Sequence, residues 1–143
     1  MKTSLRFFLL LAVVTSLILT ACEPTDGDTT SDDPRDQFVG KWQFIESFKS
    51  TEGQSYVVNI TKDITNSSQV NLENFGNPGS NDVSATGIVT SNQIVISSQR
   101  MSNNWTVDGT GKMANLVKTA MTWNYSITAG GDKLSYTASA TKQ

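Results

Sequence analysis

Residues 83–96, Val-Ser-Ala-Thr-Gly-Ile-Val-Thr-Ser-Asn-Gln-Ile-Val-Ile, decide the fold of this chain. Small and apolar residues alternate with serine and threonine up to Thr90, with the period of two that is typical of a half-buried β-strand. Ser91 and Asn92 then leave room for only a tight hairpin turn. A second alternating run follows at once, with Ile94 and Ile96 on one face. The stretch therefore predicts two antiparallel strands joined directly to each other.

The same alternation recurs six more times between residue 38 and the end of the sequence. The inward faces that we expect are Trp42, Phe44 and Phe48; Tyr56, Val58 and Ile60; Val70 and Leu72; Trp105 and Val107; Val117, Met121, Trp123, Tyr125 and Ile127; Leu134, Tyr136, Ala138 and Ala140. Short strands with brief connections indicate an all-β meander. We predict that residues 37–143 form a single eight-stranded antiparallel up-and-down β-barrel, with a two-sheet β-sandwich as the alternative.

The first 36 residues do not share this pattern. Lys2 and Arg6 precede a largely apolar run at residues 7–19, the layout of an export signal, which we expect to occupy residues 1–21. The run is shorter than the roughly 20 apolar residues of a membrane-spanning helix. Residues 23–36 hold six carboxylates and no aliphatic or aromatic side chain. Residues 22–36 are therefore predicted to form an acidic, disordered tether.

Leu19-Thr20-Ala21-Cys22 resembles the lipobox of bacterial lipoproteins, an aliphatic residue and two small ones before a cysteine. The resemblance implies cleavage before Cys22 and acylation of its sulfur and its new amino group. Cys22 is the only cysteine in the chain, so it cannot form an internal disulfide. We therefore expect a protein anchored by lipid in the bacterial cell envelope, at the outer membrane, on its periplasmic or its surface face.

Gly40-Lys41-Trp42 resembles the G-x-W signature of the lipocalins and their calycin relatives. Residues 33–42 resemble the start, and residues 133–138 the final strand, of small lipocalin-like lipoproteins of Gram-negative bacteria. This resemblance implies a lipocalin-like barrel with Gly40 and Trp42 at its base. The chain lacks the family's Thr-Asp-Tyr motif, its terminal helix, and an arginine placed to cover Trp42; Lys142 is the only cation near enough in sequence.

Several function classes do not fit the composition. The chain has no histidine, which removes Ser-His and Cys-His nucleophilic pairs and the commonest metal ligand. Catalysis by a carboxylate pair needs two such groups held close in a cleft, and only Glu46 falls on an inward strand position. Positive charge follows no face or groove, so nucleic acid is not an expected partner. We expect no enzymatic activity, no cofactor and no metal.

Two function classes remain, because a small barrel either fills with side chains or holds one small ligand. If a cavity exists, its open upper half should be lined by Tyr56, Trp105, Trp123 and Tyr136, with Glu46 as the anchor for a ligand amine. The ligand would be a small apolar or sugar-like molecule. The alternative is a filled barrel whose loops at 75–82 and 99–104 contact an envelope protein, as an adaptor, a sensor or a hydrolase inhibitor.

Overall fold

A computed structural model describes residues 33–48 and 51–143. The expected signal peptide, the proposed acylation site Cys22 and residues 23–32 of the expected tether lie outside the described residues. Within the described part, no helix has the length and apolar character needed to cross a membrane.

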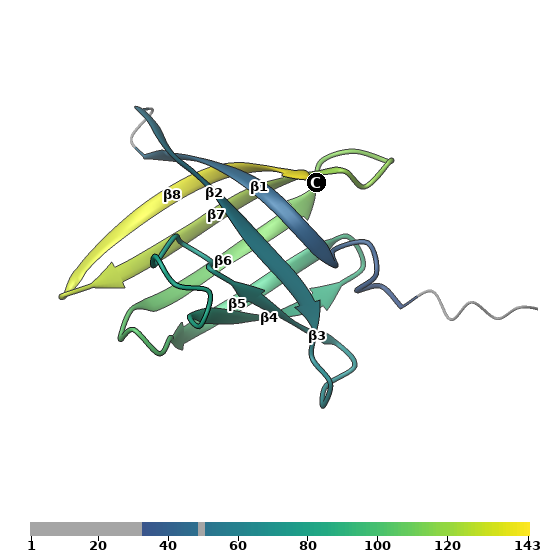
Figure 1. The fold of residues 1–143 in the computed structure, drawn as a ribbon, viewed down its shortest axis with the longest axis horizontal. Helices are drawn as coiled ribbons and strands as arrows, with labels where there is room; N and C mark the ends of the chain where they lie inside the picture. Colours follow the sequence, from purple (N-terminus) through teal and green to yellow (C-terminus); the bar gives the residue numbers. More distant parts are fainter. Residues whose placement is uncertain (1–32, 49–50) are drawn as a thin grey trace, which may run out of the picture. The chain divides into compact units, whose positions relative to one another are not determined.

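Eight antiparallel strands make up the described chain (Figure 1). They are β1 (Gly40–Phe48), β2 (Thr51–Lys62), β3 (Gln69–Glu73), β4 (Ser84–Thr90), β5 (Gln93–Arg100), β6 (Thr106–Met113), β7 (Ala120–Ala129) and β8 (Asp132–Lys142). Each strand pairs with the next, and β8 pairs with β1 from Trp42 opposite Lys142 to Ser47 opposite Thr137. The closed ring confirms the eight-stranded up-and-down barrel and excludes the two-sheet sandwich.

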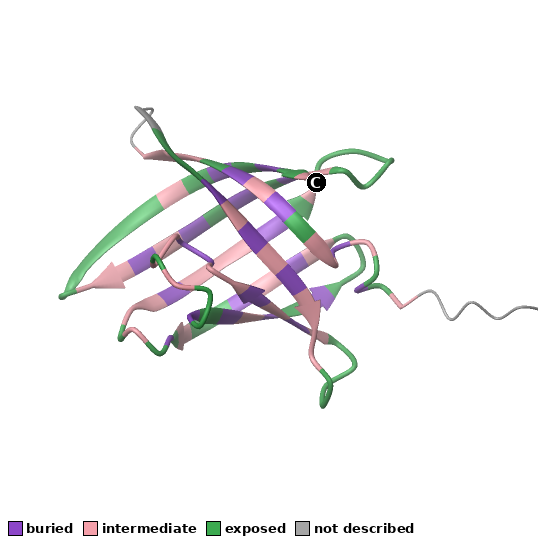
Figure 2. Ribbon diagram, in the orientation of Figure 1, coloured by how far each residue is buried: buried purple, intermediate pink, exposed green. Residues whose placement is uncertain are grey.

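Buried and exposed residues alternate along the strands, as Figure 2 shows. In β7 the buried positions are Met121, Trp123, Tyr125 and Ile127. The prediction for Val117 was wrong, because this residue lies before β7 and its side chain is 74% exposed. The Asn115 side chain accepts hydrogen bonds from the backbone N–H groups of Thr119 and Ala120. These bonds stabilise a local turn instead of a longer strand.

Leu134 also differs from the expectation, since its side chain is 41% exposed. It pairs with Ile127 close to the β7–β8 turn at Gly130 and Gly131. The inward face of the barrel is therefore more exposed near this turn than at the middle of β7.

The meander gives the barrel two distinct ends. One end, here the closed end, carries the connections at residues 63–68, 91–92 and 114–119, together with residues 33–39 and the last residue of the chain. The other, here the open end, carries the connections at residues 74–83, 101–105 and 130–131. The predicted base residues Gly40 and Trp42 lie at the closed end.

Trp42 is fully buried there, and its Nε1 donates a hydrogen bond to the carbonyl oxygen of Phe38 at 2.7 Å. The ammonium group of Lys142 lies 5.5 Å from the centroid of the Trp42 ring, within the range of a cation–π contact. Gly40 has a φ of 124°, which a residue with a side chain rarely adopts. These contacts cover the closed end with an aromatic ring and a cation.

Residues 33–38, here the N-terminal turn, pack against the same end. The guanidinium of Arg35 is buried and donates to the carbonyl oxygens of Asp63, Asn66 and Gln69, at 3.0, 3.0 and 3.3 Å. It also forms an ion pair with Asp33 at 2.8 Å. Asp33 and Arg35, which were expected to belong to the tether, therefore contact the barrel, and Arg35 holds the β2–β3 connection.

Candidate functional site

The middle of the barrel is filled by aromatic rings. Phe75, from the β3–β4 connection, is fully buried, and its ring centroid lies 4.9 Å from that of Tyr125 and 5.1 Å from that of Trp123. Phe44 adds an edge contact to Phe75 at 6.1 Å. The connection thus folds inward and places Phe75 as a plug in the barrel.

Two glycines of β6 make room for these rings. A Cβ atom at Gly111 would lie 2.3 Å from the Trp123 ring, and one at Gly109 would lie 2.4 Å from the Cβ of Tyr125. Both distances are far below van der Waals contact. Bulky residues on β7 therefore require glycine on the facing positions of β6.

Glu46 lies above this filled layer, in a network with two tyrosines. Tyr125 donates its hydroxyl hydrogen to Glu46 Oε2 at 2.5 Å, and Tyr56 donates to the same oxygen at 3.5 Å. The two hydroxyl oxygens lie 3.0 Å apart. The register of β1 with β2 shifts between Ile45 and Ser47, so that Gly53 and Gln54 together oppose Glu46. Such a bulge is a common means of directing one side chain.

Burial sets the protonation of the two phenols. It raises the pKa of Tyr125 well above its ordinary value, and the neighbouring Tyr56 and Glu46 raise it further. Burial likewise raises the pKa of Tyr56, with a further contribution from the charge of Glu46. A phenol is protonated at neutral pH at its ordinary pKa of about 10, and burial extends this state to higher pH, so both hydroxyl groups can donate to the carboxylate.

A cavity of about 420 Å³ opens at this level. We call it the mouth cavity. It is lined by Glu46, Gln54, Gly76, Asn77, Trp105, Ile127, Ala129, Asp132, Leu134 and Tyr136. Two carboxylates, two aromatic rings and two branched aliphatic side chains thus face one space, and the lining contains no lysine or arginine. Its size falls within the range of small-molecule sites.

The structure separates the residues that were expected to line a cavity together. Glu46, Trp105 and Tyr136 line the mouth cavity. Tyr56 and Trp123 do not, because both are buried in the aromatic layer, where Phe75 packs directly against Trp123. Tyr56 still contributes through its hydroxyl group on Glu46. The indole Nε1 of Trp123 has no hydrogen-bond partner among the described residues.

Sequence reasoning missed three features of this site: the plug Phe75, the Glu46–Tyr125 hydrogen bond, and the lining residues of the β7–β8 hairpin other than Tyr136. Phe75 is an isolated aromatic residue in a stretch of asparagine and glycine, and this was the available signal of a loop that turns inward. The Glu46–Tyr125 bond joins residues 79 positions apart in the sequence, and no local pattern indicates such a pairing.

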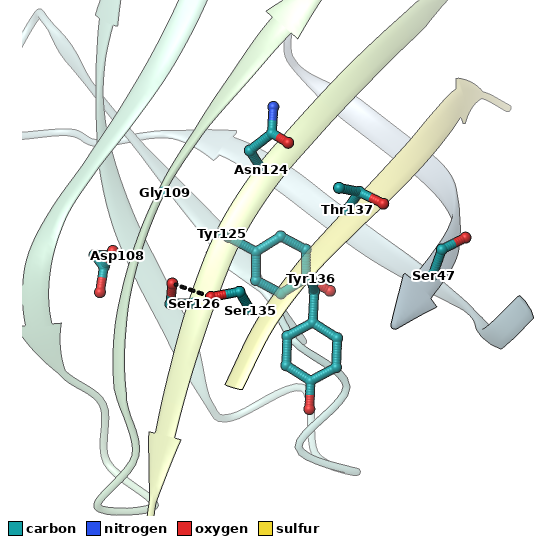
Figure 3. A pocket seen from close by; sticks show the side chains of 9 residues that line it. All are labelled: Ser47, Asp108, Gly109, Asn124, Tyr125, Ser126, Ser135, Tyr136 and Thr137. Atoms are coloured by element: carbon teal, nitrogen blue, oxygen red, sulfur yellow. Dashed lines mark hydrogen bonds between the residues drawn. The ribbon is translucent and has the colours of Figure 1, made fainter. Parts of the chain in front are cut away.

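A second hollow lies on the outer wall, across β6, β7 and β8 (Figure 3). It has a volume of about 520 Å³ and is lined mainly by outward polar residues, among them Asp108, Asn124, Ser126, Ser135 and Thr137. Ser126 and Ser135 lie 3.4 Å apart across the strands. The hollow has a larger volume than the mouth cavity, but it is more open to solvent. We therefore take the mouth cavity as the candidate site.

Among the described residues, no three histidine, cysteine, aspartate or glutamate side chains are grouped in a way that could hold a metal ion.

No protein-family model and no curated protein matches this chain. Several solved β-barrels are similar in structure. EF1p2_mFAP2b bound to DFHBI has a TM-score of 0.57 and 9% identity, covering 78% of this chain and 98% of that one. The redesigned β-barrel mFAP1 bound to DFHBI has a TM-score of 0.53 and 11% identity, covering 77% and 99%. A de novo designed fluorescence-activating β-barrel has a TM-score of 0.50 and 13% identity, covering 78% and 98%. At these identities the likeness shows a shared β-barrel fold.

Proposed function

We propose that this protein is a non-enzymatic binding module, anchored by lipid in the bacterial cell envelope, that takes a small molecule into its mouth cavity. The observation that carries this proposal is the lining of the cavity, where the Glu46 carboxylate, held by Tyr125 at 2.5 Å, shares one space with Trp105 and Tyr136. A few directed polar groups within apolar walls are typical of ligand pockets.

The lining also indicates the chemistry of the ligand. Aromatic rings stack on the apolar faces of sugars and other ring compounds, and they attract cations. Glu46 and Asp132 accept hydrogen bonds from hydroxyl or ammonium groups. The ligand that fits best has an apolar or sugar-like body and a polar end that donates hydrogen bonds. Because Phe75 fills the middle of the barrel, this ligand would occupy the mouth and not the full interior.

The barrel fold supports this use. Two of the similar solved barrels hold the small molecule DFHBI. We propose that the chain belongs to a lipocalin-like family. This proposal is based on Gly40-Lys41-Trp42 at the closed end and on Lys142 beside the Trp42 ring. The anchoring part of the proposal rests on the lipobox-like sequence that ends at Cys22.

A second candidate function is a protein–protein interaction module with a filled core. The observation that favours it is the complete burial of Phe75 among Phe44, Trp123 and Tyr125. In that case the connections at residues 74–83 and 101–105, which flank the mouth, would contact an envelope protein.

Native mass spectrometry of the acylated protein, purified from its own host, tests the binding proposal. We expect a retained small molecule whose occupancy falls at least about tenfold in the Glu46→Gln variant, because a hydrogen bond to a charged group contributes about 1.5–3 kcal/mol. Tyr136→Ala should also reduce retention. Ser98→Ala, an exposed position on β5, is the matched control and should leave retention unchanged.

The outcomes separate the two functions. A retained molecule that is unaffected by Glu46→Gln and Tyr136→Ala would contradict the mouth site. An empty barrel together with a co-purified protein, released by substitutions in residues 74–83, would favour the interaction module. Mass analysis of the N-terminal peptide tests the anchor separately: we expect acyl groups on Cys22, and a free thiol there would refute lipid anchoring.

A further inference from the structure

We propose that the closed end of the barrel is a membrane-contacting surface, which inserts the tips of two loops into the interface of the bilayer and directs the mouth cavity away from it. This inference rests on the proposed acylation of Cys22 but not on any ligand. The loops are the β2–β3 connection, with Ile64 at its tip, and the β6–β7 connection, with Leu116 and Val117.

Exposed apolar side chains gather at this end. Leu116 is 100% exposed, Ile64 is 99% exposed and Val117 is 74% exposed, and the other exposed large apolar residues reach only 39–46%. Single exposed apolar residues are common on protein surfaces. Here, however, the three largest exposures all fall on connections of one end of the barrel and none on the strands. Branched aliphatic side chains at loop tips are suited to entry into a membrane interface.

The two loops lie on different sides of the closed end. Four strands separate the β2–β3 connection from the β6–β7 connection around the ring in either direction. Figure 1 shows both connections projecting beyond the strands, and Figure 2 shows both as exposed. Two tips at opposite points of one rim can contact a flat surface at the same time. Two such contacts fix the orientation of the barrel on that surface, whereas one contact would leave it free to tilt.

The distribution of charged residues between the two ends also favours contact between the closed end and a membrane. Among the described side chains, the closed end carries six basic residues (Arg35, Lys41, Lys62, Lys112, Lys118 and Lys142) and three acidic ones (Asp33, Asp36 and Asp63). The open end carries five acidic residues (Glu46, Glu73, Asp82, Asp108 and Asp132) and two basic ones (Arg100 and Lys133). A surface with anionic lipids attracts the first end and repels the second.

The chain enters the barrel at this end. Residues 22–33 reach at most about 40 Å when fully extended, because each residue spans at most about 3.3–3.6 Å. An acyl group on Cys22 would therefore keep the N-terminal turn within about 40 Å of the lipid. The carboxylates at positions 23, 26, 28 and 32 oppose the attraction to anionic lipid. The apolar tips are accordingly the primary contact, and the lysines reinforce it.

Spin labelling of the acylated protein in vesicles tests this surface. Because Cys22 is the only cysteine and its sulfur would be acylated, a label attached to Val117→Cys reports on the β6–β7 tip alone. Asn81→Cys, in the exposed β3–β4 connection at the open end, gives the matched control. In vesicles of phosphatidylethanolamine and phosphatidylglycerol at three to one, we expect the label at 117 to collide more often with oxygen and less often with a water-soluble nickel complex than the label at 81.

Adding Leu116→Asn and Ile64→Asn to the Val117→Cys chain should return the label at 117 to the water-exposed behaviour of the label at 81. Labels at 117 and 81 that behave alike in anchored protein would overturn the docking surface while leaving the anchor intact. A label at 117 shielded from both oxygen and nickel would also overturn it, since a protein partner or a second copy would then cover the tip. Protein that fails to float with the vesicles would overturn both the anchor and this surface.

Discussion

The Glu46 carboxylate shows how single residues shape the mouth of this barrel. A half-buried charge is costly unless hydrogen bonds compensate for the lost water. Tyr125 and Tyr56 supply that compensation by donating their hydroxyl hydrogens. The same arrangement leaves Glu46 on the wall of the mouth cavity, where a ligand can reach it.

Tyr125→Phe should therefore destabilise the protein. The variant keeps the buried ring and removes only the hydroxyl group, so that Glu46 retains one longer bond, from Tyr56 at 3.5 Å. We expect a loss of about 1–3 kcal/mol in the free energy of unfolding, measured with urea, because a buried acceptor is left undersatisfied. Tyr136→Phe is the control, since Tyr136 stacks on Tyr125 but is not part of the Glu46 network. Equal effects of the two variants would contradict the role of the network.

At the scale of elements, the β3–β4 connection behaves as part of the core. Most surface connections contribute little to stability, but this one buries Phe75 and pairs its ends through a bond from the Asn74 backbone N–H to the Val83 carbonyl. Asn74 also donates from its side chain to the Val57 carbonyl on β2. These bonds fix the connection across the mouth, with Phe75 pointing inward.

Phe75→Ala should open the middle of the barrel. We expect a loss of about 3–5 kcal/mol in unfolding free energy, because the ring leaves a cavity among Phe44, Trp123 and Tyr125. If the variant remains folded, it should also bind a hydrophobic fluorescent dye that the original chain excludes. Val83→Ala, at the other end of the same connection, should lower the free energy of unfolding by less, and this variant should bind no dye. A variant with unchanged stability and no dye binding would show that Phe75 is not a plug.

The N-terminal turn is a second element that contributes to the stability of the fold, and its contribution depends on charged side chains. Hydrogen bonds from Arg35 and Lys62 hold the pKa of the Asp33 carboxyl well below its ordinary value. Lys62 contacts both Asp33, at 2.9 Å, and Asp36, at 2.6 Å. A carboxyl whose pKa is lower in the folded state stabilises the fold above its unfolded pKa of about 3.9, and this contribution is lost as the pH falls.

Asp33→Asn should consequently change how the free energy of unfolding depends on pH in the acidic range. At pH 6 the variant should unfold at a lower urea concentration than the original chain. The difference should narrow as the pH falls below about 4, because Asp33 then takes up a proton in the unfolded original chain while its carboxyl stays ionised in the folded one. Asp82→Asn, in the β3–β4 connection, is the control and should follow the original curve more closely. A constant difference from pH 6 to pH 2 would contradict the assigned role of Asp33.

At the scale of the whole molecule, the pairing of β8 with β1 removes both sheet edges. Ser139 illustrates this, since it faces Ile45 on β1 and Thr122 on β7. A strand with neighbours on both sides has no free backbone groups to offer to another chain. Closure thus protects a sequence that is rich in strand-forming segments from association edge to edge.

Ser139→Pro should break this closure. Proline removes a backbone donor that lies between two paired strands, and it is found almost entirely on edge strands. We expect a loss of at least about 1–3 kcal/mol in unfolding free energy, together with concentration-dependent association seen by light scattering. Ser139→Thr, which keeps the donor and suits an exposed strand position, should remain monodisperse and change stability little. Association by both variants, or by neither, would contradict the importance of closure.

The sequence by itself determined the strands and their faces. The alternation at residues 83–96, the short turn at Ser91-Asn92 and the aromatic residues of β1 and β7 act locally, and period two follows directly from the geometry of an extended chain. Eight such runs with short connections are compatible with few strand topologies. Of these, the closed barrel was predicted. The start of β7 shows the limit, because backbone hydrogen bonds to the Asn115 side chain stabilise a turn where a strand that included Val117 was expected.

Only the tertiary structure decided what the barrel contains. Whether Trp123 lines a cavity or lies beneath one depends on Phe75, which reaches it from a connection that the strand pattern does not describe. The direction of Glu46 depends on a register shift between β1 and β2, and its partner Tyr125 lies 79 residues away in the sequence. Local periodicity carries no information on such contacts, because they arise when the ring of strands closes and distant side chains must share one interior.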